Sequence, residues 1–122
     1  MTNRWLSLTL TLASVLLLIV GNSWSVAAAA YTGGELRSTE KVSLEVARDA
    51  TLEVLNTLGF TVTRENDVLG GEFRLTASGG NKIIEVKLIE RSDTLTEIRI
   101  RVIGFGDKSL AVRILRRIEE LL

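Results

Sequence analysis

The stretch RVIGFGDKSL looks most like a site for chemistry, because two glycines there precede an acid and a lysine. A glycine-rich turn that leads into a helix can hold a phosphate, since its backbone N–H groups converge on the anion. The usual phosphate-binding patterns need a third glycine or a Gly-Lys-Ser/Thr ending, and Gly104 and Gly106 have neither. Asp107 stands at the N-cap position, where its carboxylate would take the place of the anion. We therefore expect a strand-to-helix corner with Phe105 in the core; the alternative is a small anion site that uses Lys108.

Other chemistry is limited by the residue types that the sequence lacks. The chain has no cysteine and no histidine, which removes thiolate nucleophiles, the commonest general base and the commonest transition-metal ligands. A carboxylate pair such as Glu85 and Glu97 could act as acid and base, but nothing distinguishes one pair from another. We expect no enzyme, no catalytic residue, no metal and no cofactor. A small carboxylate-dependent hydrolase is the least favoured alternative.

The charges of the chain are balanced, with 15 acidic and 15 basic residues among 122. Arg4 is the one charged residue in the first thirty, so the remainder carries a single net negative charge. Nucleic-acid-binding domains usually carry a clear positive excess. A nucleic-acid partner is therefore not expected.

Residues 1–30 have the layout of a secretory signal peptide. Arg4 supplies a positive charge, an apolar run extends from Trp5 to Val20, and the small residues from Ala27 to Ala30 suit cleavage. The alternative is an uncleaved membrane anchor, because a long uncharged stretch follows the arginine. In both cases we expect residues 31–122 to form one small domain in the periplasm or cell envelope.

Two segments have the spacing of amphipathic helices. The first is expected to begin after Ser43, a good N-cap, and to end at Gly59, which suits the left-handed position after a helix. The second extends from Lys108 to Leu122. The two apolar stripes are Ala47, Ala50, Val54, Leu55 and Leu58 in the first helix, and Ala111, Ile114, Leu115, Ile118 and Leu122 in the second.

Between these helices the apolar period changes to two, which is typical of half-buried strands. The expected core-facing residues are Phe60 and Val62; Phe73, Leu75 and Ala77; Ile84, Val86 and Leu88; and Ile98, Ile100 and Val102. Short connections that contain glycine, asparagine or aspartate favour an antiparallel meander. Gly34 to Val42 is a weaker strand candidate whose place in the sheet is left open. The predicted fold is an α+β two-layer sandwich, β-α-β-β-β-β-α, with a mainly antiparallel sheet and both helices on one face.

The other face of the predicted sheet is a candidate interaction surface. Its expected residues are Thr61, Thr63, Glu65, Glu72, Arg74, Glu85, Lys87, Glu97, Arg99 and Arg101. The candidate contacts with a partner are Arg74, Lys87, Arg99 and Arg101 on the strands and Arg113, Arg116 and Arg117 on the last helix. The competing interpretation is a solvated face of paired charges, because acids and bases are mixed. The helix arginines have two interpretations as well: contacts with lipid phosphates or an acidic partner, or compensation of the helix dipole.

Several short segments together resemble one family. They are YTGGEL from Tyr31, ATL from Ala50, LGFTVT from Leu58, TEIRIRV from Thr96, Gly106-Asp107, and RIL from Arg113. In this order and spacing the sequence resembles the small bacterial envelope proteins grouped as domain of unknown function 3568. The resemblance implies a Gram-negative source, export, and a small α+β domain with no assigned activity or catalytic residue. Many members look like lipoproteins with a cysteine near the end of the signal; this sequence lacks that cysteine, so no lipid tether is carried over.

These features predict an uncharacterised exported protein that serves as a non-catalytic periplasmic binding or interaction module. It would act through a sheet edge or the charged sheet face. The alternative is a membrane-tethered structural or stress-related component of the envelope. The expected partner is an envelope protein or the membrane surface, while the ligand and the oligomeric state are left open.

Overall fold

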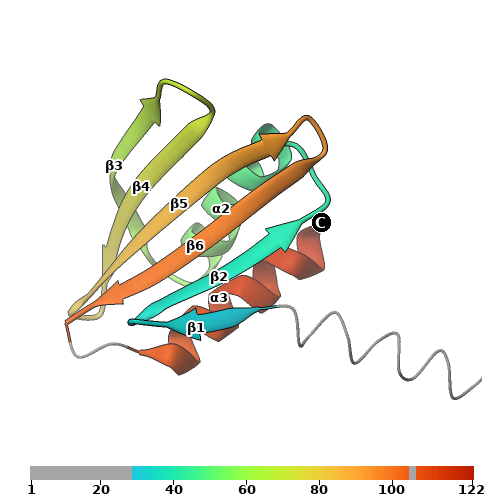
Figure 1. Cartoon of the computed structure of the whole chain (residues 1–122). Helices are drawn as coiled ribbons and strands as arrows, with labels where there is room; N and C mark the ends of the chain where they lie inside the picture. The colour runs from blue at the N-terminus through green and yellow to red at the C-terminus, as the bar shows by residue number, and fades with distance from the viewer. Residues whose placement is uncertain (1–28, 105–106) are drawn as a thin grey trace, which may run out of the picture.

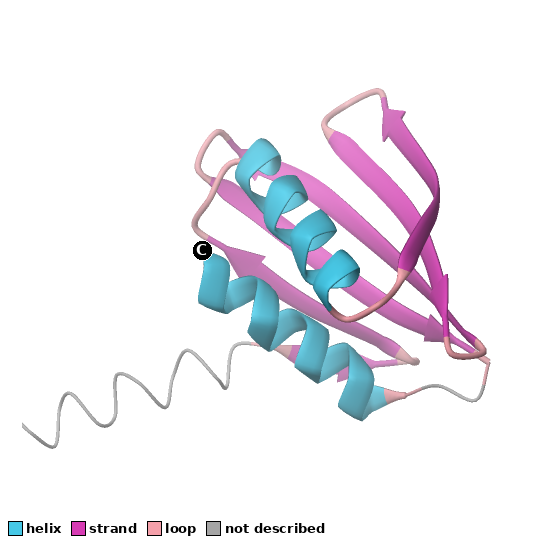
Figure 2. Cartoon of the chain, turned by 180° about the vertical axis from the view of Figure 1, so that it is seen from behind, coloured by secondary structure: helices cyan, strands magenta, loops and turns pink. Residues whose placement is uncertain are grey.

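A six-stranded antiparallel sheet forms one layer of the protein, and two helices form the other (Figure 1). The computed structural model describes residues 29–104 and 107–122. The elements are β1 (Ala30–Thr32), β2 (Glu35–Glu40), α2 (Leu44–Thr57), β3 (Thr61–Val68), β4 (Glu72–Gly79), β5 (Lys82–Ser92), β6 (Leu95–Ile103) and α3 (Lys108–Leu121). Figure 2 shows α2 and α3 lying against the same face of the sheet. The predicted α+β class with a mainly antiparallel sheet is therefore confirmed.

The strand order in the sheet is β1-β2-β6-β5-β4-β3. The predicted order of elements along the chain needs one correction, at the N-terminal end. The described residues begin with a hairpin, β1–β2, where a single strand was expected. Gly33 and Gly34 close it with φ values of 61° and 79°, as the tight turns that match the twist of paired strands require. β1 has only three residues, too few to show an alternation that sequence reading could detect.

Both helices begin where the sequence predicted. The Ser43 hydroxyl accepts a hydrogen bond from the Val46 N–H at 3.3 Å and caps α2. The buried residues are Ala47, Ala50, Thr51, Val54 and Leu55 in α2, and Leu110, Ala111, Ile114, Leu115 and Ile118 in α3. Leu122, expected on the apolar stripe, is instead exposed beyond the end of α3, and Leu110 in its first turn is buried. Neither helix of the described chain is long and apolar enough to cross a membrane.

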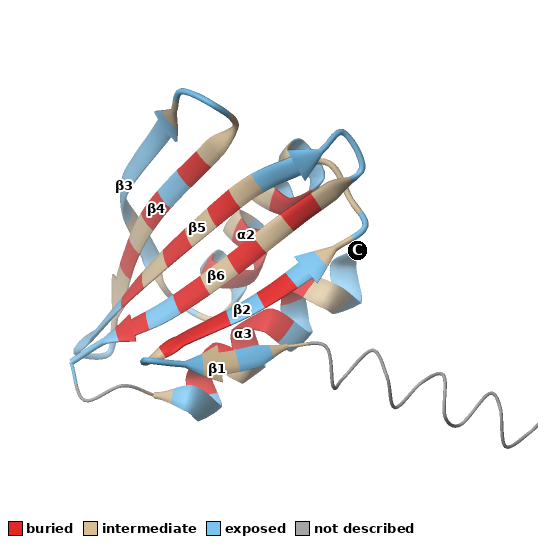
Figure 3. Cartoon of the chain, viewed as in Figure 1, coloured by how far each residue is buried: buried red, intermediate tan, exposed pale blue. Residues whose placement is uncertain are grey.

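The central strands bury alternate residues, as Figure 3 shows for β4, β5 and β6. All nine core-facing residues expected in these three strands are buried. Their apolar side chains pack with those of α2 and α3 in one cluster. The opposite face, which we call the open face, is toward the viewer in Figure 1 and is covered by no element of the described chain.

A β-bulge decides which residues of β3 share the open face. The register between β3 and β4 shifts between Val62 and Arg64, so Thr63 is an extra residue and every later residue changes face. Arg64 thereby joins the open face. Glu65, which was expected there, pairs instead with Leu75 on the helix-covered face.

Candidate functional site

Four basic residues lie in one row across the open face. Arg74 of β4 lies directly opposite Lys87 of β5. Lys87 in turn lies opposite Arg99 of β6, and Arg99 lies opposite Arg37 of β2. Directly opposed residues of antiparallel strands have Cβ atoms about 4.5–5.5 Å apart, so like charges there repel one another. We call Arg37, Arg74, Lys87 and Arg99 the basic row.

The basic row follows from a motif that four strands share. Each strand carries an acid two residues before its base: ELR on β2, EFR on β4, EVK on β5 and EIR on β6. Residues two apart point to the same face of a strand. Because neighbouring strands run in opposite directions, alignment of the bases places the acids alternately on the two sides of the row. Glu72 and Glu97 lie on one side, and Glu35 and Glu85 lie on the other.

The β4–β5 turn fixes this alignment for the pair of bases on β4 and β5. Gly80 and Asn81 have φ values of 56° and 64°, the left-handed pair of a two-residue hairpin turn. Such a turn leaves no freedom in the pairing that follows it, and Arg74 meets Lys87 as a result. The predicted loop was a turn of four residues, and the structure confines it to these two.

Three bases of the row pair with the acid of their own strand, and one does not. The pairs are Arg37 Nε with Glu35 Oε1 at 2.7 Å, Arg74 Nε and Nη2 with the Glu72 oxygens at 3.1 and 3.3 Å, and Arg99 Nε with Glu97 Oε1 at 3.0 Å. Within residues 29–104 and 107–122, no carboxylate oxygen lies within 4.0 Å of the Lys87 ammonium. Lys87, which lies between Arg74 and Arg99, is therefore the one base of the row without an acidic partner among the described residues.

Two acids beside the row, Glu72 and Glu97, have lowered pKa values. The pKa of Glu72 is lowered, chiefly by its hydrogen bond from Arg74, with further lowering by Lys87 and Arg99. For Glu97, burial is the largest single effect and raises the pKa, but the hydrogen bonds from Arg91 and Arg99 outweigh it, so the pKa is lowered. The basic row is therefore flanked at neutral pH by anions at Glu72 and Glu97, on one of its two sides.

A hollow of about 280 Å³ opens on the open face at the β3 end of the row. Arg64, Arg74 and Lys87 line it, one from each of three adjacent strands. Asn66, Thr76 and Glu85 add polar groups to its wall. In the part of the chain that the structure describes, Arg64 has no carboxylate oxygen within 4.0 Å either. Two of the three cations around the hollow therefore have no partner in the described fold.

The structure divides the seven predicted contact residues between two layers. Arg74, Lys87 and Arg99 lie in the basic row. Arg101 lies on the same face of β6, two residues after Arg99, and its Nη2 is 3.7 Å from Glu35 Oε2. Arg113, Arg116 and Arg117 are exposed on α3, in the other layer. The fold thus does not bring the helix arginines to the basic row.

Two residues of the surface were not predicted. Arg37 carries a signal that the sequence shows, because ELR repeats the acid-x-base spacing of the other three strands. Arg64 carries none, since its place depends on the bulge at Thr63. A bulge is set by the pairing of two strands and is not marked by residue type here.

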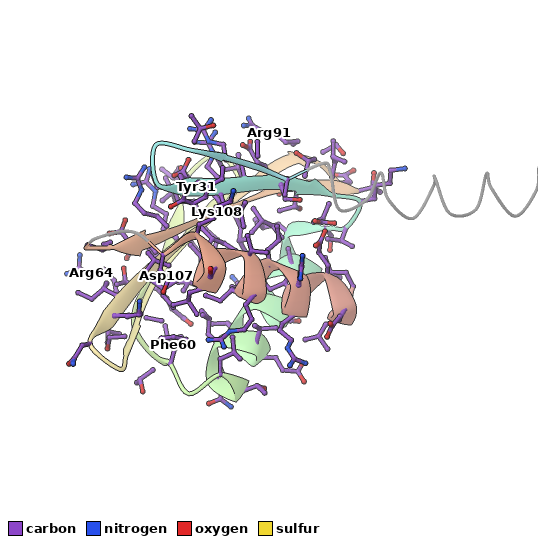
Figure 4. The ribbon with its side chains drawn as sticks, turned by 90° about the horizontal axis from the view of Figure 1, so that it is seen from below. Tyr31, Phe60, Arg64, Arg91, Asp107 and Lys108 are labelled. Carbon is purple, nitrogen blue, oxygen red and sulfur yellow. The ribbon has the colours of Figure 1, made fainter. Side chains whose placement is uncertain are left out.

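In the corner that resembled a phosphate-binding loop, the carboxylate of Asp107 takes the position that a bound anion would occupy. The Leu110 N–H donates to Asp107 Oδ1 at 3.0 Å, and the Lys82 ammonium donates to Oδ2 at 2.6 Å. The lysine bond, followed by the backbone bond, lowers the pKa of Asp107. The predicted N-cap is therefore confirmed, and Lys108 instead lies 5.6 Å from the centre of the Tyr31 ring (Figure 4). The expected burial of Phe105 falls outside the described residues.

The carboxylates do not form the pair that the sequence suggested. Glu85 and Glu97 lie on opposite sides of the basic row. Two other carboxyl groups meet where α3 passes the end of β2. Burial first, and then the neighbouring Glu40, raise the pKa of Glu119 to about 7. The Ser38 hydroxyl donates to Glu40 Oε1 at 2.8 Å on the same strand.

The fold and this geometry define a small two-layer α+β domain with a charged, open sheet face. The chain belongs to the family described as "Protein of unknown function (DUF3568)", which matches residues 4–121. The family resemblance inferred from the sequence is therefore confirmed over nearly the whole chain. No curated protein is similar enough to count as a match. The family brings no activity, so a functional assignment has to come from the open face itself.

Proposed function

We propose that this protein is an exported, non-catalytic binding module that holds an acidic partner on the open face of its sheet. The basic row is the observation that carries the proposal. Four like charges in direct cross-strand register reduce the stability of a sheet. Local rules of stability are broken mainly where a surface serves another purpose, so the row is best explained by binding.

The competing interpretation, a solvated face of paired charges, accounts for only part of the row. Exposed ion pairs contribute at most about 1 kcal/mol each, and they give three of the four bases a partner. Lys87 has none in the described fold, although it stands between Arg74 and Arg99. A partner that brings negative charge to Lys87 would relieve the repulsion that the fold leaves in place.

The compartment rests on the first thirty residues. Their charged start, apolar run and small residues support export. The family match begins at residue 4 and so includes this segment. An acidic surface of the cell envelope, on a protein or on the membrane, is the partner class that fits both the compartment and the row.

Site-specific photo-crosslinking in the native host tests the proposal. A photoreactive amino acid at Thr39 reports on the open face beside the row, and the same residue at Val46, 47% exposed on α2, is the matched control. We expect a discrete crosslinked product from position 39 and none from position 46. A product from position 46 alone, or none from position 39, would contradict the proposal.

A membrane-tethered envelope component is the second candidate, and the uncharged run after Arg4 favours it. The intact mass of the native protein separates the two. A mass that begins between Ala28 and Tyr31 in the osmotic-shock fraction supports a free module. A mass that retains the first thirty residues, found in the membrane fraction, supports the tether.

A further inference from the structure

The hollow at the β3 end of the basic row has the donor groups of an anion site. Arg64, Arg74 and Lys87 approach it from three neighbouring strands. Arg74 donates two hydrogen bonds to Glu72, one from Nε and one from Nη2. Because a guanidinium has five N–H donors, three remain for a ligand. Together with the unpaired Arg64 and Lys87, the hollow offers more positive donors than the described chain satisfies.

The arrangement of these donors favours phosphate over carboxylate. A carboxylate presents two oxygens in one plane, which one arginine can bind in a bidentate manner. A phosphate ester presents up to three charged oxygens in different directions, with a charge between one and two. Three cations on three strands, around one hollow, match the second pattern.

The volume of the hollow and its other lining residues indicate which organic group is attached to the phosphate. A volume of about 280 Å³ is several times the roughly 30 Å³ that one water molecule occupies in the liquid, so a small organic group fits beside the phosphate. Glu85 accepts hydrogen bonds only, while Asn66 and Thr76 can accept or donate. A group with hydroxyls satisfies this wall, and an apolar group would leave it unsatisfied.

We infer that the hollow lined by Arg64, Arg74 and Lys87 binds a phosphate ester whose organic part carries hydroxyl groups. This inference deepens the proposed function and rests on the open face being the binding surface. A sugar or glycerol phosphate group displayed by a partner or a lipid has this chemistry. The phosphate neutralises the row at Lys87, and the hydroxyls meet Glu85.

Glycerol 3-phosphate is the probe, added to the ¹⁵N-labelled protein as isolated while the backbone amide signals are recorded by NMR. We expect saturable shifts confined to β3, β4 and β5. Lys87→Gln and Arg64→Gln each remove one charged hydrogen-bond donor, which should weaken binding about tenfold. Arg113→Gln, a cation removed from the other layer, is the matched control and should bind as the parent does.

A stability measurement shows whether a variant fails because it has lost the site or because it has lost the fold. Without ligand, Lys87→Gln should unfold at a higher urea concentration than the parent, because it removes a like charge that lies between two others. A variant that is more stable and also binds less supports the site. Equal affinity in the Lys87→Gln, Arg64→Gln and parent proteins, or no saturable shift, overturns it.

Two further arms identify the source of the phosphate. Vesicles of phosphatidylglycerol, compared with phosphatidylcholine, present a glycerol phosphate on a lipid, as a diester with one charge and two free oxygens. Binding to the anionic vesicles that Lys87→Gln abolishes supports the site with a lipid headgroup as ligand; binding of the soluble ester alone supports it with a free ester. If neither binds while position 39 still crosslinks, the phosphate site is wrong and the proposed function stands.

Discussion

Asp107 shows how one residue settles a local ambiguity in this sequence. Its carboxylate caps α3 through the Leu110 N–H and also holds Lys82. We expect Asp107→Ala to lower the urea midpoint of unfolding more than Asp107→Asn does, because asparagine keeps the capping acceptor and loses only the charge. Equal effects of the two substitutions would show that the cap contributes nothing. Equilibrium unfolding followed by circular dichroism makes the comparison.

The role of Asp107 could be predicted from the sequence and the position of Arg64 could not, and one reason explains both. A cap depends on residues within one helical turn, so its signal is local and readable. The position of Arg64 depends on how β3 pairs with β4 after the bulge, which is a property of two segments. Single residues of the open face could therefore be named in advance, but the hollow that three of them form could not.

Among the elements, the end of β4 packs closely on the segment before β3 at Gly79. A Cβ at this position would lie 2.9 Å from Phe60 Cδ1 and 3.1 Å from the Gly59 carbonyl oxygen. We expect Gly79→Ala to destabilise the fold by about 1–3 kcal/mol through overpacking. In a Phe60→Ala background the same change should cost less, because the nearest contact has gone. Additive effects in urea unfolding would place the strain elsewhere.

The contact between α3 and β2 should make stability depend on pH. The pKa of Glu119 is raised from 4.5 to about 7 by burial and by Glu40, with Arg116 acting in the opposite direction. Between these values the folded protein holds a proton that the unfolded chain has released. The contribution of this group is therefore full below about pH 4.5 and is lost as the pH rises through 7.

Glu40→Gln tests this contact, because it removes the neighbouring charge. At pH 8 the variant should be more stable than the parent by on the order of 1 kcal/mol, a figure that allows for solvent screening. At pH 5 the two proteins should differ less. Urea unfolding at both pH values measures the difference, and an unchanged pH dependence in the variant would rule out the coupling.

The elements themselves were largely predictable because their patterns are long. The alternation in β4, β5 and β6 and the apolar stripes of α2 and α3 were correct apart from the helix ends. The three residues of β1 were too few to show a period. The pairing of β2 with β6 joins segments about sixty residues apart and has no local signature.

In the molecule as a whole, the two faces of the sheet have different roles. The covered face carries the aliphatic core and holds the fold together with α2 and α3. The open face carries repeated acid-x-base motifs and a row of like charges whose repulsion lowers stability. This division allows the open face to change its charges without loss of the core. It also explains why composition alone, with balanced charge, does not reveal the surface.

The occupancy of the open face in the cell is the most direct test of this account. The chain has no cysteine, so Thr39→Cys on the open face and Arg113→Cys on α3 each create a single thiol. Their labelling rates with a small maleimide are compared in the intact envelope and in the isolated protein. We expect slower labelling in the envelope than in isolation at position 39 and an unchanged rate at position 113. Equal ratios at the two positions, or protection at position 113 alone, would contradict it.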